Sequence, residues 1–458
     1  MEEIIINVSK YVICLLMVLY TLYAFIVFRG KNKNKQKWIF RKQNMIMFFI
    51  HAFSYVCICV GMYQNDDFDL VKVVLFYLAQ VIVMLLTILV YKMIYYNLSR
   101  LVLNNMLLLL SIGFVMLTRL SFDKAMKQFV YVCAALLLCL LVPAIIRKFK
   151  FLRRLGWLYA VLGLLLLMLV LVIGKEEYGA KNWIVIGGFR AQPSEFVKII
   201  FVFFLAAILS KSKKLLDVIK ISVLAGAYVI VLVLEKDLGG ALIFFVTYLF
   251  ILYVATGQPF YLFGGLTAGS GAAVLAYRVF SHVQVRVTAW LNPWKVIDNQ
   301  GYQITQSLFA IGTGGWFGMG LTKGLPTSIP VVSSDFIFSA IAEEMGGAFA
   351  ICLIFVYLSC FIMFVNIAMK MKSEFYKLTA LGLSVVYIFQ VFLTLGGVTK
   401  FIPSTGVTLP LISYGGSSVI STIIIFSVIQ GMYVLNQDEV EAIEERKEQV
   451  AKQQYETE

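Results

Sequence analysis

Residues 156–174 read GWLYAVLGLLLLMLVLVIG, an apolar run that contains no charged side chain. Lipid offers the peptide backbone no hydrogen-bond partner, so a segment that crosses a bilayer must pair its own backbone groups. An α-helix of about 20 apolar residues does this across the hydrocarbon core. This stretch therefore predicts a membrane-spanning helix.

Similar runs recur along the whole chain, and we expect thirteen membrane-spanning helices. The expected spans are residues 11–28, 45–63, 70–94, 103–119, 128–146, 156–174, 195–210, 217–235, 238–255, 260–280, 345–367, 376–397 and 417–435. Of the 458 residues, 61% are hydrophobic and 14% are charged, against about 25% charged residues in soluble domains. This composition excludes an ordinary globular protein. All seven cysteines lie inside the apolar runs, which predicts small buried side chains and neither a disulfide nor a metal site.

The positive charge of the chain predicts its orientation. The formal net charge is +14, and most Lys and Arg residues fall in short clusters between the apolar runs. Such clusters are typical of cytoplasmic loops, so they indicate a membrane topology and no nucleic-acid partner. On the expected count they share one side with the charged tail, residues 436–458. We therefore expect the N-terminus outside and the C-terminus in the cytoplasm. The clusters are Arg29–Lys37, Arg147–Arg154, Lys211–Lys214 and Lys370–Lys372.

Four segments on the opposite side have a polar composition that burial in lipid would not select. In the first, residues 181–198, Ser194 is a candidate helix N-cap with Glu195 in the first turn. Glu195 and Lys198 are three residues apart, so they share a helix face. A lysine at this depth costs about 2.5–3.5 kcal/mol unless it is paired or faces a wet cavity. The pair therefore indicates either a structural seal of the helix end or a functional cavity.

The other three segments contain long, broken stretches. Residues 281–334 form the longest polar loop, too rich in glycine near residues 311–320 for a plain helix, and loops of this length are usually functional. Asp335 and Glu343 lie eight residues apart, close to one helix face. Residues 400–418 interrupt the apolar pattern with Gly and Pro, which is tolerated where the backbone lines a cavity or is buried in protein.

The polar side chains of these segments restrict the chemistry. Neither His51 nor His282 is a strong catalytic candidate, and the sequence has no Ser-His-Asp, HExxH or P-loop pattern. Proton transfer would then depend on carboxylates that stand among fixed cations at one water–lipid boundary. That arrangement suits a lipid-linked anionic substrate whose head group lies outside the membrane.

Four motifs in these segments resemble the signatures of the SEDS family, the group of FtsW, RodA and SpoVE. The motifs are Gln192-Pro-Ser-Glu-Phe-Val-Lys198, Gly301-Tyr-Gln-Ile-Thr-Gln-Ser307, Asp335-Phe-Ile-Phe338 with Glu343-Glu344, and Thr405-Gly-Val-Thr-Leu-Pro410-Leu-Ile-Ser413-Tyr-Gly-Gly-Ser417. The resemblance implies an all-α polytopic membrane protein with a ten-helix SEDS-like core at residues 99–435. Residues 1–98 would form an extension of about three further transmembrane helices, for which the family offers no role.

The resemblance also implies a function. SEDS proteins are peptidoglycan glycosyltransferases of the bacterial cell membrane, which join lipid II units into glycan strands at its outer face. They are surrounded by membrane lipids and act together with a class B penicillin-binding protein, which is the transpeptidase. By analogy with inverting glycoside chemistry, a carboxylate that takes the acceptor proton would invert the anomeric centre. No cofactor is expected, and assistance of the pyrophosphate by a divalent cation is left open.

The family's essential residues map onto Asp298, Glu195 and Lys198. The family aspartate commonly stands two residues after the tryptophan of the Asn-Pro-Trp motif, but here Val296 holds that position and Asp298 lies four residues after Trp294. We keep Asp298 as the expected general base, because no other acid lies between Trp294 and the next motif. The residues expected to bind substrate are Arg190, Gln192, Ser194, Tyr302, Gln303, Asp335, Lys400 and Ser413.

Two other classes of function fit the same pattern. A transporter that flips lipid-linked cell-wall precursor would also need charged groups inside the membrane. A non-catalytic scaffold for a cell-wall synthesis complex is the third candidate. Polymer formation from lipid II in detergent distinguishes the enzyme from the flippase, because flipping creates no glycosidic bond.

Overall fold

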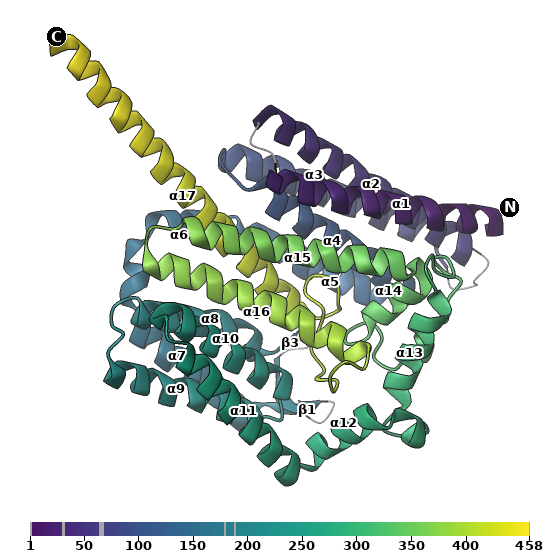
Figure 1. Ribbon diagram of the computed structural model, residues 1–458. Coiled ribbons are helices and arrows are strands. Elements are labelled where there is room, and N and C mark those ends of the chain that lie inside the picture. The colour runs from purple at the N-terminus through teal and green to yellow at the C-terminus, as the bar shows by residue number, and fades with distance from the viewer. Residues whose placement is uncertain (1, 30–32, 64–67, 178–179, 187–188, 458) are drawn as a thin grey trace.

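Long apolar helices make up almost all of this computed structural model, which describes residues 2–29, 33–63, 68–177, 180–186 and 189–457 (Figure 1). Twelve helices in these ranges are long and apolar enough to cross a membrane, and they correspond to twelve of the expected spans. The remaining expected span is α8 (Pro193–Leu209), which has 17 residues and buries most of its side chains against other helices. The prediction of a helical polytopic protein is confirmed.

The helices fall into the expected extension and core. The extension contains α1 (Glu2–Arg29), α2 (Lys33–Met62) and α3 (Leu70–Ile94). The core spans besides α8 are α4 (Arg100–Leu120), α5 (Phe122–Cys139) with α6 (Val142–Lys148), α7 (Gly156–Ile173), α9 (Leu215–Leu234), α10 (Leu238–Thr256), α11 (Pro259–Val279), α15 (Gly347–Lys370), α16 (Glu374–Val398) and α17 (Gly416–Thr457). The shorter helices are η1 (Lys150–Arg154), α12 (Ser281–Leu291), η2 (Pro293–Val296), α13 (Tyr302–Gly314), η3 (Pro326–Ser328) and α14 (Ile337–Met345).

A small antiparallel sheet, which the sequence did not predict, precedes α8. Its strands are β1 (Lys175–Glu177), β2 (Ala180–Ile186) and β3 (Phe189–Ala191), in the order β1-β2-β3. The backbone N–H of Lys181 donates to the carbonyl oxygen of Glu235 at 2.9 Å. This bond fastens the sheet to the connection between α9 and α10.

The polar segments gather at one end of the bundle, which we call the loop end. Three hydrogen bonds join them, from Trp290 Nε1 to the Lys400 carbonyl at 3.1 Å, from the Gln192 N–H to Ser417 Oγ at 2.9 Å, and from the Tyr414 N–H to the Ser333 carbonyl at 2.8 Å. Because the segments come from four separate parts of the sequence, the loop end is where they can form one site.

The basic clusters and the C-terminal tail lie at the opposite end of the bundle. Arg147 of α6 pairs with Asp438 of α17 at 2.5 Å, and the C-terminal part of α17 projects from the bundle (Figure 1). The N-terminus lies at the loop end, where Glu2 pairs with Lys323 at 2.9 Å. The two termini therefore sit at opposite ends, as an odd number of spans requires. Which end faces the cytoplasm stays a prediction.

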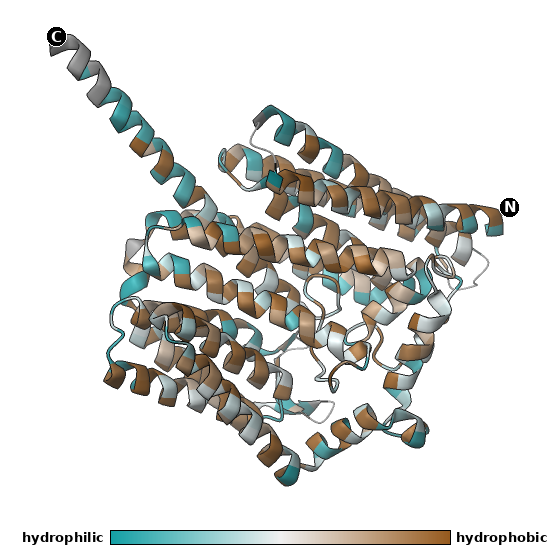
Figure 2. Ribbon diagram, viewed as in Figure 1, coloured by the Kyte–Doolittle hydropathy of each residue, from teal (hydrophilic) through white to brown (hydrophobic). Residues whose placement is uncertain are grey.

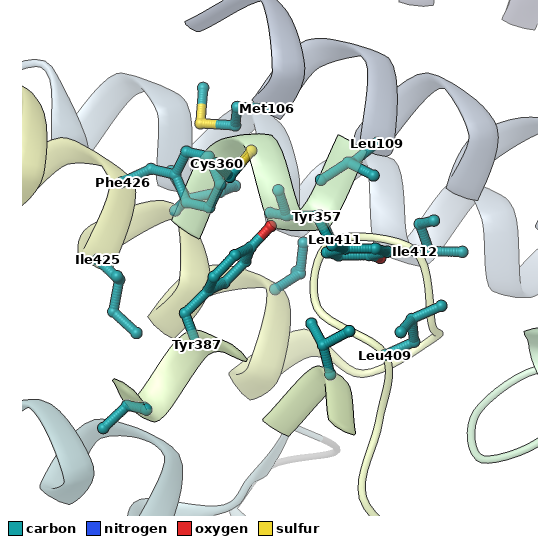
Figure 3. Packing of buried hydrophobic residues seen from close by; sticks show 14 of the residues in the cluster. Met106, Leu109, Tyr357, Cys360, Tyr387, Leu409, Leu411, Ile412, Ile425 and Phe426 are labelled. Atoms are coloured by element: carbon teal, nitrogen blue, oxygen red, sulfur yellow. The ribbon is translucent and has the colours of Figure 1, made fainter. Parts of the chain in front are cut away.

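Residues 409–413 of the interrupted segment before α17 are buried in the protein core. Leu409, Leu411 and Ile412 pack among side chains of α4, α15, α16 and α17 (Figure 3). The hydroxyl of Tyr357 donates to the Pro410 carbonyl at 2.7 Å. A Cβ at Gly113 of α4 would lie 2.9 Å from the Ile412 carbonyl oxygen, so only glycine fits there without a shift. The backbone can leave the helical form here because protein, not lipid, surrounds it.

The tail forms the distal part of α17. Its described side chains from residue 440 onward are exposed, and Figure 2 shows this part as mainly hydrophilic, in contrast to the apolar bundle.

Candidate active site

A buried ion pair lies in the first two turns of α8. Lys198 Nζ is 2.5 Å from Glu195 Oε2. Lys198 is 3% exposed, and Glu195 is partly exposed. The Ser421 hydroxyl of α17 donates to the same Glu195 oxygen at 2.8 Å. The expected sharing of one helix face is therefore observed, and both charges are held inside the bundle with matched partners.

Gln390 of α16 connects this pair to the interrupted segment, residues 400–418. Lys198 Nζ donates to Gln390 Oε1 at 2.7 Å, while Gln390 Nε2 donates to the Thr408 carbonyl at 3.1 Å. The Thr408 hydroxyl in turn donates to Ser418 Oγ at 2.7 Å. A chain of hydrogen bonds thus runs from the buried ammonium to the loop end.

Asp237 accepts hydrogen bonds from polar side chains at and before the start of α8. Gln192 Nε2 donates to Asp237 Oδ2 at 3.1 Å, Ser194 Oγ donates to the same atom at 3.4 Å, and Asn182 Nδ2 does so at 3.3 Å. The other oxygen, Oδ1, caps α10 through the backbone N–H of Gly240 at 2.8 Å. The carboxylate therefore holds the sheet, α8 and α10 together.

The predicted N-cap at Ser194 was wrong. The N-cap of α8 is Gln192, and the helix begins at Pro193, because the fixed φ of proline suits the first helical position and its missing N–H is not needed there. Ser194 is one residue inside the helix, and its hydroxyl bonds to Asp237 instead of capping.

Two acids from other elements act on the charge of Arg286 in α12. Burial lowers its pKa, and the charges of Asp237 and Asp335 oppose that effect. The Asp335 carboxylate and the guanidinium both lie beside Gly406, where an added Cβ would be 3.5 Å from Oδ2 and 3.9 Å from Nη2. Arg286 Nη1 also donates to the Ser404 carbonyl at 3.3 Å. Burial raises the pKa of Asp335, and the Ser334 hydroxyl and the charge of Arg286 oppose that effect. One cation therefore joins the second, third and fourth polar segments.

The Ser413 hydroxyl forms hydrogen bonds with backbone groups. Its hydroxyl donates to the Ser334 carbonyl and accepts from the Leu409 N–H at 2.8 Å. The first bond holds the fourth segment beside Ser334, the residue that precedes Asp335, and the second closes a turn within the fourth segment. The side chain is 3% exposed, so its geometry favours a structural role over direct contact with substrate.

The remaining expected site residues lie at the surface of the loop end. Asp298 is exposed in the turn after η2, and within the described residues no hydrogen bond or ion pair connects it to Lys198 or Glu195. The other four are Tyr302 and Gln303, exposed in the first turn of α13, Arg190, exposed in β3, and Lys400, which is partly exposed with a φ of +60°. The structure therefore does not bring Asp298 to the ion pair.

Several polar residues of the site were missed by the sequence analysis, namely Asp237, Arg286, Gln390, Ser421 and Glu235. Glu235 is fully buried, and neither carboxylate oxygen has a hydrogen-bond partner in the described part of the chain. Burial and the nearby charge of Asp237 raise its pKa to about 8. A signal was present, because two acids in the very short link between two apolar runs are costly at a membrane boundary.

Known proteins show the same core. The cell cycle protein family of FtsW, RodA and SpoVE matches residues 99–437. The chain belongs to this family. The peptidoglycan glycosyltransferase RodA of Mycobacterium bovis is 35% identical over 351 residues, which cover 70% of this chain and 75% of that protein. The probable peptidoglycan glycosyltransferase FtsW of Halorhodospira halophila is 36% identical over 280 residues, with 58% and 70% covered.

Solved structures of FtsW/RodA/SpoVE relatives extend the match to three dimensions. A chain of a peptidoglycan synthase complex, studied for the coordination of polymerization and crosslinking, superposes with a TM-score of 0.63 at 27% identity. The match covers 98% of that chain but 74% of this one. The crystal structure of RodA from Thermus thermophilus gives a TM-score of 0.55 at 27% identity, with 96% and 73% covered. The family match begins at residue 99, so α1–α3 lie outside it.

Proposed function

We propose that this peptidoglycan glycosyltransferase joins lipid II units into glycan strands at the outer face of the bacterial cytoplasmic membrane. The observation that carries the proposal is the buried Lys198–Glu195 pair, connected through Gln390 to the loop end where all four family motifs meet. A lipid-linked substrate with a pyrophosphate needs a cation in a place where its lipid can also be accommodated. Relatives named as peptidoglycan glycosyltransferases support the same activity.

The reaction forms a bond between the acceptor sugar's hydroxyl oxygen and the anomeric carbon of the donor. The donor's undecaprenyl pyrophosphate leaves with the electron pair of the broken bond, and its negative charge needs nearby cations. We assign the acceptor proton to Asp298, whose exposed carboxylate is free to accept it. Lys198, held by Glu195, balances charge in the site, and Arg190 and Lys400 are candidates for phosphate contact. Attack from the face opposite the leaving group inverts the anomeric centre.

Substitution of Asn for Asp298 in the purified full-length protein tests the assignment. Polymerisation of lipid II in detergent should fall by about 10²- to 10⁴-fold, the usual contribution of a general base. The neighbouring exposed Asn299 provides a control, because Asn299→Asp would add a carboxylate at the same turn without replacing the first. Near-normal strand synthesis by Asp298→Asn would remove Asp298 from the mechanism.

The same assay separates the enzyme from the flippase. Detergent micelles contain no bilayer to cross, so glycan chains made by the unmodified protein can come only from polymerisation. If lipid II stays monomeric while the protein moves labelled precursor across vesicle membranes, the transporter hypothesis replaces ours. A class B penicillin-binding protein is the proposed partner, because a relative of this chain occurs in a complex that couples polymerization to crosslinking.

A further inference from the structure

The N-terminal extension is bound to the core by buried polar contacts. The Tyr20 hydroxyl donates to Asn105 Oδ1 at 3.0 Å, and His51 Nδ1 shares a hydrogen bond with Ser111 Oγ at 2.8 Å. α4 is buried along almost its whole length, because α2 of the extension packs on it together with α5, α15 and α17 of the core. Polar groups between membrane helices have no water to return to, so such bonds favour permanent association over free movement of the extension.

At the loop end, α1 contacts the glycine-rich connection between α13 and η3, residues 315–325. Lys10 Nζ donates to the Gly318 carbonyl at 3.2 Å, and the rings of Tyr11 and Phe317 are 5.2 Å apart. Glu2 pairs with Lys323, as described above. Ile6, only 1% exposed, lies so close to Gly320 that a Cβ there would be 2.7 Å from its Cγ2.

The connection is held from its other side by core residues. The N–H groups of Met319 and Gly320 donate to the Glu343 and Glu344 carbonyls at 2.9 and 3.0 Å. Arg119 of α4 pairs with Glu344 at 3.0 Å. Residues 315–325 therefore lie between the extension and the C-terminal end of α14, and a displacement of α1 or α2 would be transmitted to α14.

The helices α13 and α14 run side by side in the same direction. Ser307 Oγ in the middle of α13 is hydrogen-bonded to Ser339 Oγ in the first turn of α14 at 2.7 Å. A Cβ at Gly314, the last residue of α13, would lie 2.0 Å from the carbonyl oxygen of Ala342, further along α14. α13 begins at Tyr302, shortly after Asp298, and α14 begins at Ile337, shortly after Asp335. Their C-terminal ends contact the connection that the extension holds.

We propose that the extension, residues 2–98, is a positioning element of the active site. It fixes the far ends of α13 and α14, and thereby sets where Asp298, Tyr302 and Asp335 stand relative to the buried ion pair. The 13-residue α13 is about 20 Å long, so a small tilt at one end moves the other by about an ångström or more, a displacement that can reduce turnover about 10²-fold. The inference rests on the proposed function for its activity readout.

Gly61 offers a minimal perturbation of this contact. A Cβ at Gly61 would lie 1.9 Å from Thr322 Oγ1 and 2.9 Å from Thr322 Cβ, so rotation of the threonine side chain cannot relieve the clash. Gly61 is the last residue but one of α2, and alanine is a better helix former than glycine, so Gly61→Ala does not weaken the helix itself. Thr322 has a φ of +78°, which glycine adopts readily, so Thr322→Gly removes both the obstacle and the strain.

The test compares the full-length protein with Gly61→Ala, Thr322→Gly and the double variant. We expect Gly61→Ala to lower kcat for lipid II by about tenfold or more, with a smaller change in KM, because Lys198 and Glu195 lie on α8, which packs on the core helices α7, α10, α16 and α17. The double variant should regain most of the lost turnover. Hydrogen exchange of the 318–320 amides should rise in Gly61→Ala and return in the double variant.

Either of two results would overturn the proposal. One is unchanged turnover per folded Gly61→Ala molecule although exchange in residues 315–325 has risen, which is the outcome for a purely structural contact. The other is a loss of turnover that Thr322→Gly does not restore. If Gly61→Ala does not fold, Ile6→Ala takes its place, with the lipid-facing Leu15→Ala as matched control. If the unmodified protein makes no polymer, the proposed function fails, and the exchange readout alone decides whether the extension fixes α13 and α14.

Discussion

Replacing Lys198 by Met should separate the structural role of the buried pair from its chemical role. Met keeps the length of the side chain but removes the ammonium that contacts Glu195 at 2.5 Å and Gln390 at 2.7 Å. The Glu195 carboxylate then stays in the bundle with the Ser421 hydroxyl as its remaining donor among the described residues. Breaking one side of a buried pair costs about 3–5 kcal/mol, which is a large part of a typical stability of about 5–15 kcal/mol.

The double variant Lys198→Met with Glu195→Gln decides between the two roles. It leaves no unpaired charge, and replacement of a whole buried pair is often neutral for stability, so its thermal midpoint in detergent should return close to that of the unmodified protein. Its polymerase activity should stay about 10²- to 10³-fold low, as when one group that stabilises transition-state charge is removed. The assay is lipid II polymerisation per folded molecule. A stable double variant within about threefold of normal turnover would show that the pair only seals the helix.

Three further predictions concern residues around the site. Glu235 has a pKa raised to about 8 by burial, so its protonated form stabilises the fold fully below about pH 4.5 and this stability is lost as the pH rises through 8. At pH 9, Glu235→Gln should therefore have an unfolding free energy about 2–5 kcal/mol above that of the unmodified protein and unfold at a higher temperature. At pH 5 the two proteins should be equally stable. Lower stability of the variant at both pH values would mean that the ionised carboxylate has a partner. Gly113→Ala should cost about 1–3 kcal/mol of stability by overpacking against Ile412, while Gly226→Ala, with open space around its Cβ position, should be neutral or slightly stabilising in the same thermal scan. Arg286→Lys keeps the charge but loses the planar fork, so kcat/KM for lipid II should fall about 10- to 100-fold, and an unchanged value would exclude a specific role for the guanidinium.

The spanning helices could be predicted from sequence because lipid leaves the backbone one local solution. A run such as residues 156–174 must be helical whatever its neighbours are. The same argument predicts the segregation of charge, since loops joining such helices alternate between two ends. The Glu195–Lys198 contact was also predictable, because three residues along one helix fix the geometry without any knowledge of the fold.

The features of the fold and of the site that could not be predicted from the sequence depend on contacts between distant segments. The partner of Lys198 in α16 is Gln390, 192 positions along the chain, and no local pattern marks an amide inside an apolar run as that partner. The sheet before α8 is held by the Glu235 carbonyl of another segment, so its short strands carry too weak a signal of their own. The N-cap differs from the prediction at Ser194 for a local reason, because the preference of Pro193 for the first helical position outweighs the capping preference of serine.

The depth of the ion pair explains why the candidate site comes from so many elements. Gln390 precedes the end of α16 at Val398 by about two turns, and Lys198 follows the start of α8 at Pro193 by about one and a half turns, so their contact lies about 8–12 Å below the loop end. A lysine at that depth is tolerable only if it is shielded from lipid, and α8 is accordingly buried on nearly all sides. Its polar surroundings must then be supplied by backbone that descends from the loop end, which is what the interrupted segment around Thr408 does. Asp298 stays at the surface, so a substrate that engages both groups must reach from the aqueous boundary into the bundle. A pyrophosphate that joins a sugar to a lipid extends from the aqueous boundary into the membrane in this way. A soluble sugar phosphate would stay in water and would not need a cation inside the bundle.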